Sequence, residues 1–216
     1  AGLTRQNWKS AVLIVLAFVG IYIVRTVVSV AVQGVSDGSG MQYVKEWAAM
    51  FKNPMMWLNI AALPINYFFV FIAFFGEEYG WRYYLQPVLQ KRFGLRAGVI
   101  ILGIVWGLWH IPDDLFYYTQ TSGIQMIFAQ QITCISLGIF FAYAYMKTQN
   151  IWVPVCLHYL NNNLIPIISG TFSADVLENQ TVSWKDLPVA LVLNGLCFGF
   201  FLLADVFKKK EVQEEE

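Results

Sequence analysis

The sequence has few charged residues for its length. Only 13% of its 216 residues are Asp, Glu, Lys or Arg, while 57% are hydrophobic. Soluble domains carry about 25% charged residues, so the shortage excludes an ordinary soluble domain and indicates an integral membrane protein. The formal net charge is zero, so the basic character of nucleic-acid-binding proteins is missing and no nucleic-acid partner is expected.

Cysteine and histidine are also scarce. Cys134, Cys156 and Cys197 lie in apolar segments at spacings that match no metal motif, so we interpret them as packing residues. The two histidines, His110 and His158, lie in two different apolar segments. Polar side chains are costly inside a membrane, so each of them needs a partner or a function there.

Six apolar segments approach the length of about 20 residues that a membrane-spanning helix needs. They cover residues 10–32, 57–75, 97–110, 124–146, 151–168 and 187–207. No internal repeat stands out, and no linker divides the chain. The sequence therefore predicts a single all-α domain over residues 1–216, a polytopic transmembrane helical bundle of about six spans.

The basic residues are concentrated on one side of this predicted bundle. Ten Lys and Arg residues fall on the side that holds both termini and the basic turn 91–96. Only Lys45, Lys52 and Lys185 fall on the other side. Positively charged loops stay in the cytoplasm. We therefore expect an integral protein of a bacterial cytoplasmic membrane, with both termini in the cytoplasm.

An acid pair follows the second apolar segment. Glu77 and Glu78 come directly after the apolar run 65–75, and Arg82 stands four residues after the second acid. Residues four apart share a helix face, so Arg82 can neutralise Glu78. Glu77 lies about 100° round the helix and can face a different group. In a soluble protein this pattern is usually a solvated helix pair, but the apolar run before it leaves a solvated pair and a buried site as equal alternatives.

The acid pair and the two histidines reach similar depths in the predicted bundle. Glu77 precedes Lys91 by 14 residues, and His110 follows Arg96 by 14, which places both roughly 21 Å from the same turn at about 1.5 Å per residue. His158 follows Lys147 by 11 residues, or roughly 16 Å. This convergence requires the second helix to continue past the acid pair.

Two more pairs of residues share helix faces. Trp106 can pack beside His110 and fix its imidazole, and His158 shares a face with Asn162. Each has a plain structural alternative, because a lone intramembrane histidine is often a packing residue and an asparagine can join helices by hydrogen bonds. The two aspartates at 113–114 follow a proline and are interpreted as a solvated loop.

Together these residues resemble the motifs of the CPBP family, also called the Abi family, of CAAX prenyl endopeptidases and bacteriocin-processing enzymes. The three motifs are Glu77-Glu78-x-x-x-Arg82, Trp106-x-x-x-His110 and His158-x-x-x-Asn162. The resemblance covers residues 65–168, a four-helix catalytic core, and the order of the motifs matches. One departure is Trp106, where the family usually has Phe.

The resemblance implies an intramembrane endopeptidase whose cavity opens to the cytoplasm. Glu77 and His110 would activate the attacking water. His158 and Asn162 would stabilise the oxyanion, while Glu78 and Arg82 would support that site, and the packing of Trp106 supports His110. The expected partners are the bilayer and a hydrophobic or membrane-associated peptide: a CAAX-type peptide, a bacteriocin leader or a signalling peptide.

A metal is an open alternative for this site. Glu77, His110 and His158 could form a zinc site with one open position. The sequence has no His-Glu-x-x-His string, so we prefer a site that requires no cofactor.

Two other functions remain open from the sequence. A membrane scaffold that regulates a kinase or a peptide exporter would not need the polar motifs intact. A proton-coupled transporter could use buried acids and histidines as a relay, but the two matching halves with interrupted segments that transporters often show are not evident.

Overall fold

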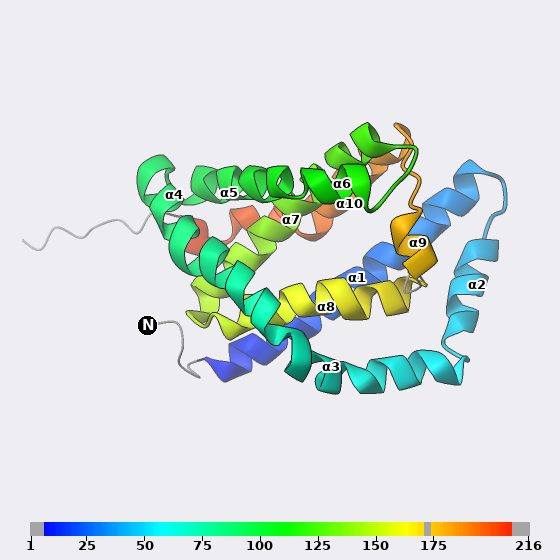
Figure 1. Cartoon of the computed structure of the whole chain (residues 1–216), viewed down its shortest axis with the longest axis horizontal. Helices are drawn as coiled ribbons and strands as arrows, with labels where there is room; N and C mark the ends of the chain where they lie inside the picture. The colour runs from blue at the N-terminus through cyan, green and yellow to red at the C-terminus, as the bar shows by residue number, and fades with distance from the viewer. Residues whose placement is uncertain (1–6, 171–173, 209–216) are drawn as a thin grey trace, which may run out of the picture.

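The computed structural model describes residues 7–170 and 174–208, and over these residues it contains helices and no strand. This confirms the predicted all-α fold. The elements are α1 (Trp8–Ser36), α2 (Gln42–Met50), α3 (Pro54–Glu78), the π-helix η1 (Tyr79–Leu85), α4 (Gln86–Phe93), α5 (Leu95–Trp109), α6 (Ile111–Phe116), α7 (Gly123–Thr148), α8 (Trp152–Ser169), α9 (Ala174–Glu178), α10 (Asp186–Cys197) and the 3₁₀ helices η2 (Gly199–Leu203) and η3 (Asp205–Phe207) (Figure 1).

Four helical stretches are long and apolar enough to cross a membrane: Trp8–Ser36, Pro54–Phe93, Leu95–Phe116 and Gly123–Thr148. The other two predicted spans are helical but do not meet that standard. The α8 helix carries a histidine and three asparagines among its apolar residues, and α10 has only 12 residues before it passes into η2. The protein is thus a polytopic bundle of four clear spans, with two more helices packed against them.

The second span continues past the acid pair, as the sequence analysis required. Its start is fixed by Asn53, whose side chain accepts a hydrogen bond from the Met55 N–H, and by Pro54 in the first turn. The helix then runs through Gly80 as the π-helix η1 and ends at Phe93, where Gly94 turns the chain with a φ of +88°. Glu77 and Glu78 therefore lie within a 40-residue helical stretch and not at its end.

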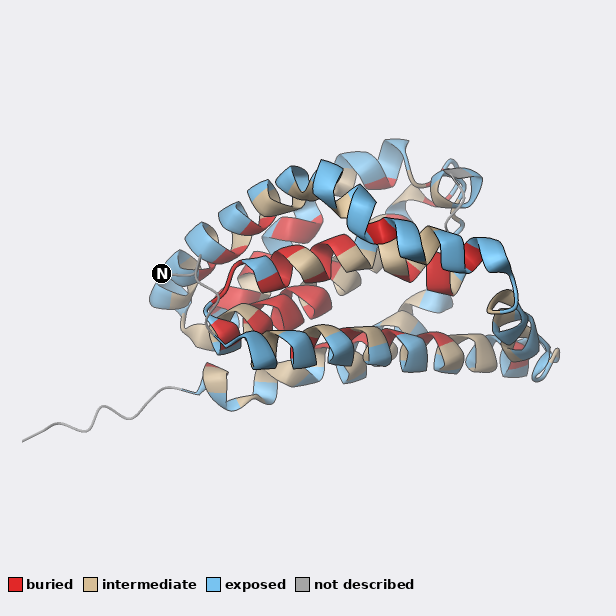
Figure 2. Cartoon of the chain, turned by 90° about the horizontal axis from the view of Figure 1, so that it is seen from below, coloured by how far each residue is buried: buried red, intermediate tan, exposed pale blue. Residues whose placement is uncertain are grey.

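The helices that carry the motifs pack closely around α7. A Cβ atom on Gly103 of α5 would lie 2.6 Å from the Ile135 Cα of α7, so only glycine allows this approach. Figure 2 shows the buried residues on the inner helices, with exposed residues on the outward faces. Outward residues of α3 such as Phe68 and Phe69 are 72% and 75% exposed, as expected of side chains that face lipid.

One end of the bundle, which we call the basic end, gathers the α4–α5 turn, the end of α7 and the last described residues. The Asn7 Nδ2 donates to the Thr148 carbonyl at 3.4 Å. The Gln90 Nε2 lies 3.2 Å from the Met146 Sδ. In Figure 1 this end holds α4 and the start of α1, at the left.

The opposite end, which we call the mouth end, gathers α2, α6, α9 and the loops beside them (Figure 1). The Trp47 Nε1 donates to the Ile168 carbonyl at 2.7 Å and so joins α2 to the end of α8. The Gln180 N–H donates to the Tyr118 carbonyl at 2.9 Å, which ties the segment after α9 to the segment after α6.

Candidate active site

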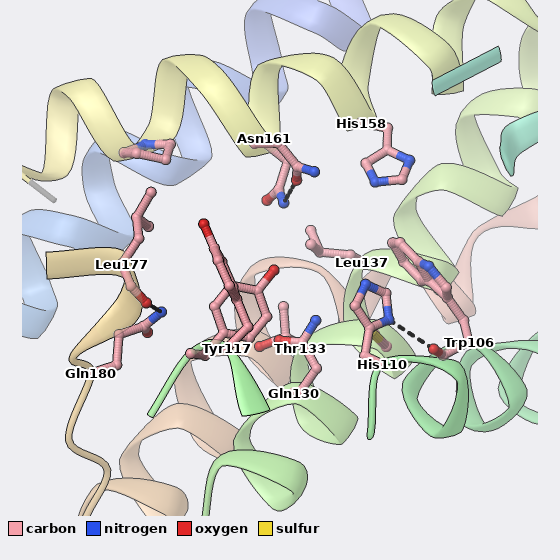
Figure 3. Close-up of a pocket in the computed structure, with 14 residues that line it drawn as sticks. Trp106, His110, Tyr117, Gln130, Thr133, Leu137, His158, Asn161, Leu177 and Gln180 are labelled. Atoms are coloured by element: carbon pink, nitrogen blue, oxygen red, sulfur yellow. Dashed lines mark hydrogen bonds between the residues drawn. The ribbon is translucent and has the colours of Figure 1, made fainter. Parts of the chain in front are cut away.

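A cavity of about 350 Å³ lies between α5, α7 and α8 and is bounded at the mouth end by the segments after α6 and α9 (Figure 3). Its lining includes Trp106, His110, His158 and Asn162, which the sequence analysis selected. Of the three side chains predicted to reach a similar depth, the two histidines line this cavity and Glu77 does not. Figure 3 shows the two imidazoles entering from opposite walls, His158 from α8 and His110 from the end of α5.

His110 is held by its own helix. Its Nδ1 lies 2.9 Å from the Trp106 carbonyl oxygen, which can only accept a hydrogen bond. Nδ1 therefore carries the proton, and the lone pair of the neutral ring lies on Nε2. The indole of Trp106 packs edge-on against this ring with centroids 5.8 Å apart, as predicted.

His158 is held by Glu78. Its Nδ1 lies 2.9 Å from the Glu78 Oε1, and both side chains are buried, with 3% and 0% exposed. A carboxylate oxygen accepts, so His158 Nδ1 also carries a proton and leaves Nε2 for other partners. The two residues are 80 positions apart, and no pattern in the sequence indicated this contact, because it depends on how α8 crosses the second span.

The predicted pairing of Glu78 with Arg82 is confirmed. The Arg82 Nε lies 3.1 Å from the Glu78 Oε2, and neither side chain is exposed. The guanidinium also lies over the rings of Trp106 and Phe141, at 5.2 and 5.4 Å from their centroids. Glu78 thus lies between Arg82 and His158, and the guanidinium of Arg82 packs on the aromatic rings next to the site.

The π-helix η1 helps to turn this row of residues inward. Glu78, Arg82 and Gln86 succeed one another at intervals of four and are all buried. In a regular α-helix a step of four residues rotates about 40° off the starting face. The wider turn of a π-helix, with i→i+5 bonds, reduces this drift. The sequence predicted the continuous helix but not the π-helical turn.

Glu77 occupies a different position from Glu78. It is half-buried, and its Oε2 accepts a hydrogen bond from the Trp81 Nε1 at 3.5 Å. It is not among the residues that line the cavity. It is connected to His110 through aromatic contacts, because Trp81 packs on Trp109 at 6.2 Å and Trp109 packs on His110 at 5.1 Å between centroids.

The site does not show an assembled set of metal ligands. Within residues 7–170 and 174–208, no three His, Cys, Asp or Glu side chains are grouped as a metal would require. Glu77, His110 and His158 therefore do not form such a group in this structure. Whether the protein needs a metal stays a prediction.

A hydrogen-bonded chain connects α1 to Asn162. The Tyr22 hydroxyl, on α1, donates to the Asn161 Oδ1 at 2.6 Å. The Asn161 Nδ2 in turn donates to the Asn162 Oδ1 at 2.9 Å. This hydrogen bond orients the Asn162 amide, whose Nδ2 carries two N–H donors at the cavity. No pattern in the sequence indicated Tyr22, which lies in a different helix 139 residues away from Asn161.

Asp114 corrects one expectation. The sequence analysis placed residues 113–114 in a solvated loop, but both lie in α6, and Asp114 is fully buried. Neither of its carboxylate oxygens has a hydrogen-bond partner among the described residues. Asp113 is exposed as expected. Burial and these two carboxylates raise the pKa of Tyr118 to about 12, so its hydroxyl stays protonated at the mouth of the cavity.

Comparison with known proteins gives one family and one relative. The model of the type II CAAX prenyl endopeptidase Rce1-like family matches residues 57–164, which is half of the chain. The CAAX prenyl protease 2 of Methanococcus maripaludis is 28% identical over 125 residues, 54% of this chain and 45% of that protein. The chain therefore spans less than half of the length of this relative. No solved structure matches this chain.

Proposed function

We propose that this chain, which belongs to the type II CAAX prenyl endopeptidase Rce1-like family, is an intramembrane endopeptidase for a hydrophobic or membrane-associated peptide. One observation carries the proposal. His110 and His158 come from different helices, each is fixed through Nδ1, and both line one cavity beside Asn162. A base and an oxyanion donor on facing walls are what water-driven peptide hydrolysis requires.

His110 and Glu77 would activate the water. The Nε2 lone pair of His110 takes a proton from water, and the resulting hydroxide attacks the carbonyl carbon of the peptide. The C–N bond then breaks, and the same proton passes to the leaving amine nitrogen, so atoms and charge balance. Glu77 would share this role as a second carboxylate near the base; it accepts a hydrogen bond from Trp81, and the ring contacts of Trp81 with Trp109 and of Trp109 with His110 position these groups without carrying a proton.

His158 and Asn162 would stabilise the oxyanion. The Glu78 carboxylate accepts a hydrogen bond from the His158 Nδ1 and pairs with Arg82, and a protonated His158 would donate its Nε2–H to the oxyanion. The amide of Asn162 supplies the second donor. A preorganised donor of this kind is worth about 3 kcal/mol in the transition state.

The central experiment measures cleavage by the purified full chain in liposomes. The substrates are a farnesylated CAAX-type peptide, the same peptide without farnesyl, and an apolar leader peptide. We expect the chain to hydrolyse at least one of them, and His158→Ala to reduce cleavage to background. Cleavage by His158→Ala at the rate of the unmodified chain would refute the assignment, as would solute flux with no cleavage.

A metal chelator separates the two versions of this site. We expect o-phenanthroline to leave cleavage unchanged, because the three candidate ligands are not grouped. Complete loss of cleavage that zinc restores would instead favour the alternative with zinc on Glu77, His110 and His158.

Tyr22 should act on catalysis without touching the substrate. Tyr22→Phe removes the hydrogen bond that orients Asn161 and hence Asn162. Since one hydrogen bond is worth about 1 kcal/mol, we expect kcat to fall by roughly fivefold at unchanged KM. In an Asn162→Ala background the same change should cost nothing further.

Tyr159→Phe is the matched control for Tyr22→Phe. Tyr159 is equally buried, and its hydroxyl donates to the Leu63 carbonyl at 2.7 Å, away from the asparagines. Loss of this hydroxyl should lower the stability of the protein and leave kcat unchanged. An equal loss of kcat in both variants would mean that Tyr22 acts through packing alone.

A further inference from the structure

We infer that Arg25, an arginine inside the first membrane span, strengthens the oxyanion site through a directed chain of hydrogen bonds. The inference rests on the proposed function and adds a positioning residue to it. Arg25 does not line the cavity. It acts through Tyr22, whose hydroxyl connects α1 to the two asparagines at the cavity.

Arg25 places a charge in the apolar part of α1 without an acidic partner. It lies 11 residues before the end of the helix at Ser36, roughly 17 Å along the axis. The side chain is half-buried. Among the described residues it forms no salt bridge, and its Nε has no hydrogen-bond partner. A charged side chain at such a depth is costly and marks a functional position.

The guanidinium of Arg25 lies over the ring of Tyr22, with 5.7 Å between its Cζ and the ring centroid. A cation at this distance is attracted to the electron-rich face of the ring. Because it draws electron density from the phenol, the hydroxyl becomes a stronger hydrogen-bond donor. Tyr22 is buried, so water screens the contact little. Its hydroxyl oxygen lies 2.6 Å from the Asn161 Oδ1, at the short end of the range for such bonds.

The hydrogen bonds of this chain all point toward the cavity. Tyr22 donates to Asn161, and the Asn161 Nδ2 donates to the Asn162 Oδ1 at 2.9 Å (Figure 3). The amide of Asn162, which lines the cavity, is the last donor. Dipoles aligned in one direction reinforce one another, as they do along a helix. The positive end of the chain therefore meets the oxyanion, and the negative end, at Tyr22, meets the charge of Arg25.

Such a chain favours the transition state over the bound substrate. The peptide carbonyl carries little charge before attack, so the cation of Arg25 interacts weakly with it. When the oxyanion forms, the chain is polarised between a cation at one end and an anion at the other. Interactions that strengthen only in the transition state raise kcat and leave KM unchanged. Arg25 should therefore affect kcat and not the binding of the substrate.

Arg25→Met tests this assignment in the liposome cleavage assay with the full chain. We expect kcat to fall roughly threefold at unchanged KM, less than for Tyr22→Phe, because Arg25 acts only through that ring. Arg25→Lys keeps the charge and should retain most of the rate. The melting temperature of Arg25→Met should not fall, since the substitution removes a charge from the membrane. The control is Thr26→Val, because Thr26 is a buried polar residue of the same helix outside the chain, and this variant should keep the normal kcat.

A double variant with Tyr22→Phe separates an action through Tyr22 from an independent one. In that background Arg25→Met should cost no further kcat. An equal loss in both backgrounds, or full kcat in the single Arg25→Met variant, would overturn the inference. Either result would leave the proposed function standing, because the unmodified chain would still cleave a substrate that His158→Ala does not. An unmodified chain that cleaves nothing would instead refute the proposed function and the inference with it.

Discussion

Glu78→Gln is expected to destabilise the protein by about 3–5 kcal/mol and to abolish cleavage. The glutamine has the same shape and can still accept a hydrogen bond from His158. It cannot neutralise Arg82, whose guanidinium is fully buried at 3.1 Å from Glu78. An unpaired charge is left in a medium of low dielectric constant, and His158 loses its carboxylate partner. Thermal melting in detergent and the liposome cleavage assay measure the two effects.

Two further variants separate charge from shape in this result. Glu78→Gln combined with Arg82→Met should recover most of the stability and none of the activity, because the unpaired cation is gone but His158 still lacks its carboxylate. Asp205→Asn breaks an exposed pair with Lys208 and should leave the melting temperature unchanged, since exposed pairs contribute little. A Glu78→Gln protein that melts and cleaves like the unmodified chain would contradict the role assigned to this carboxylate.

The sequence was informative where a single helix carries the relationship. The spacing of Glu78 and Arg82, and that of Trp106 and His110, predicted contacts that the structure confirms, because residues four apart meet on any helix. The depth count predicted that Glu77, His110 and His158 reach similar depths; the two histidines line one cavity, and Glu77 lies outside that lining. That count needed only the length of each helix and the position of the turn from which it starts.

The sequence did not predict contacts that depend on the angle at which two helices cross. The contact of Glu78 with His158 and that of Tyr22 with Asn161 join residues 80 and 139 positions apart. Helix periodicity indicates which face of each helix is polar, but not which polar faces meet. The burial of Asp114 was missed for a related reason. A Pro-Asp-Asp string is typical of a loop, and only the packing of α6 against α7 buries one of the two acids.

His110→Gln should reduce kcat by about 10²–10⁴-fold at an unchanged melting temperature. The imidazole is half-buried, and its hydrogen bond goes to a carbonyl of the same helix, so little of the fold depends on it. The lone pair on its Nε2 would take the proton from water. The amide of glutamine cannot accept a proton from water near neutral pH. The rate of cleavage at saturating substrate and thermal melting measure the two quantities.

Glu77→Gln decides whether Glu77 belongs to the same base. If Glu77 and His110 together form the base, the loss of Glu77 should lower kcat by a similar factor, and the double variant should lose little more than either single one, as in catalytic groups that act as a unit. The matched control is Asp113→Asn, because Asp113 is an exposed acid that follows the second motif. This variant should cleave the substrate at the normal rate. Glu77 lies outside the lining of the cavity, so full activity of Glu77→Gln is the outcome that would remove it from the machinery. His110 would then be the sole base, with the second acid, Glu78, acting only through His158.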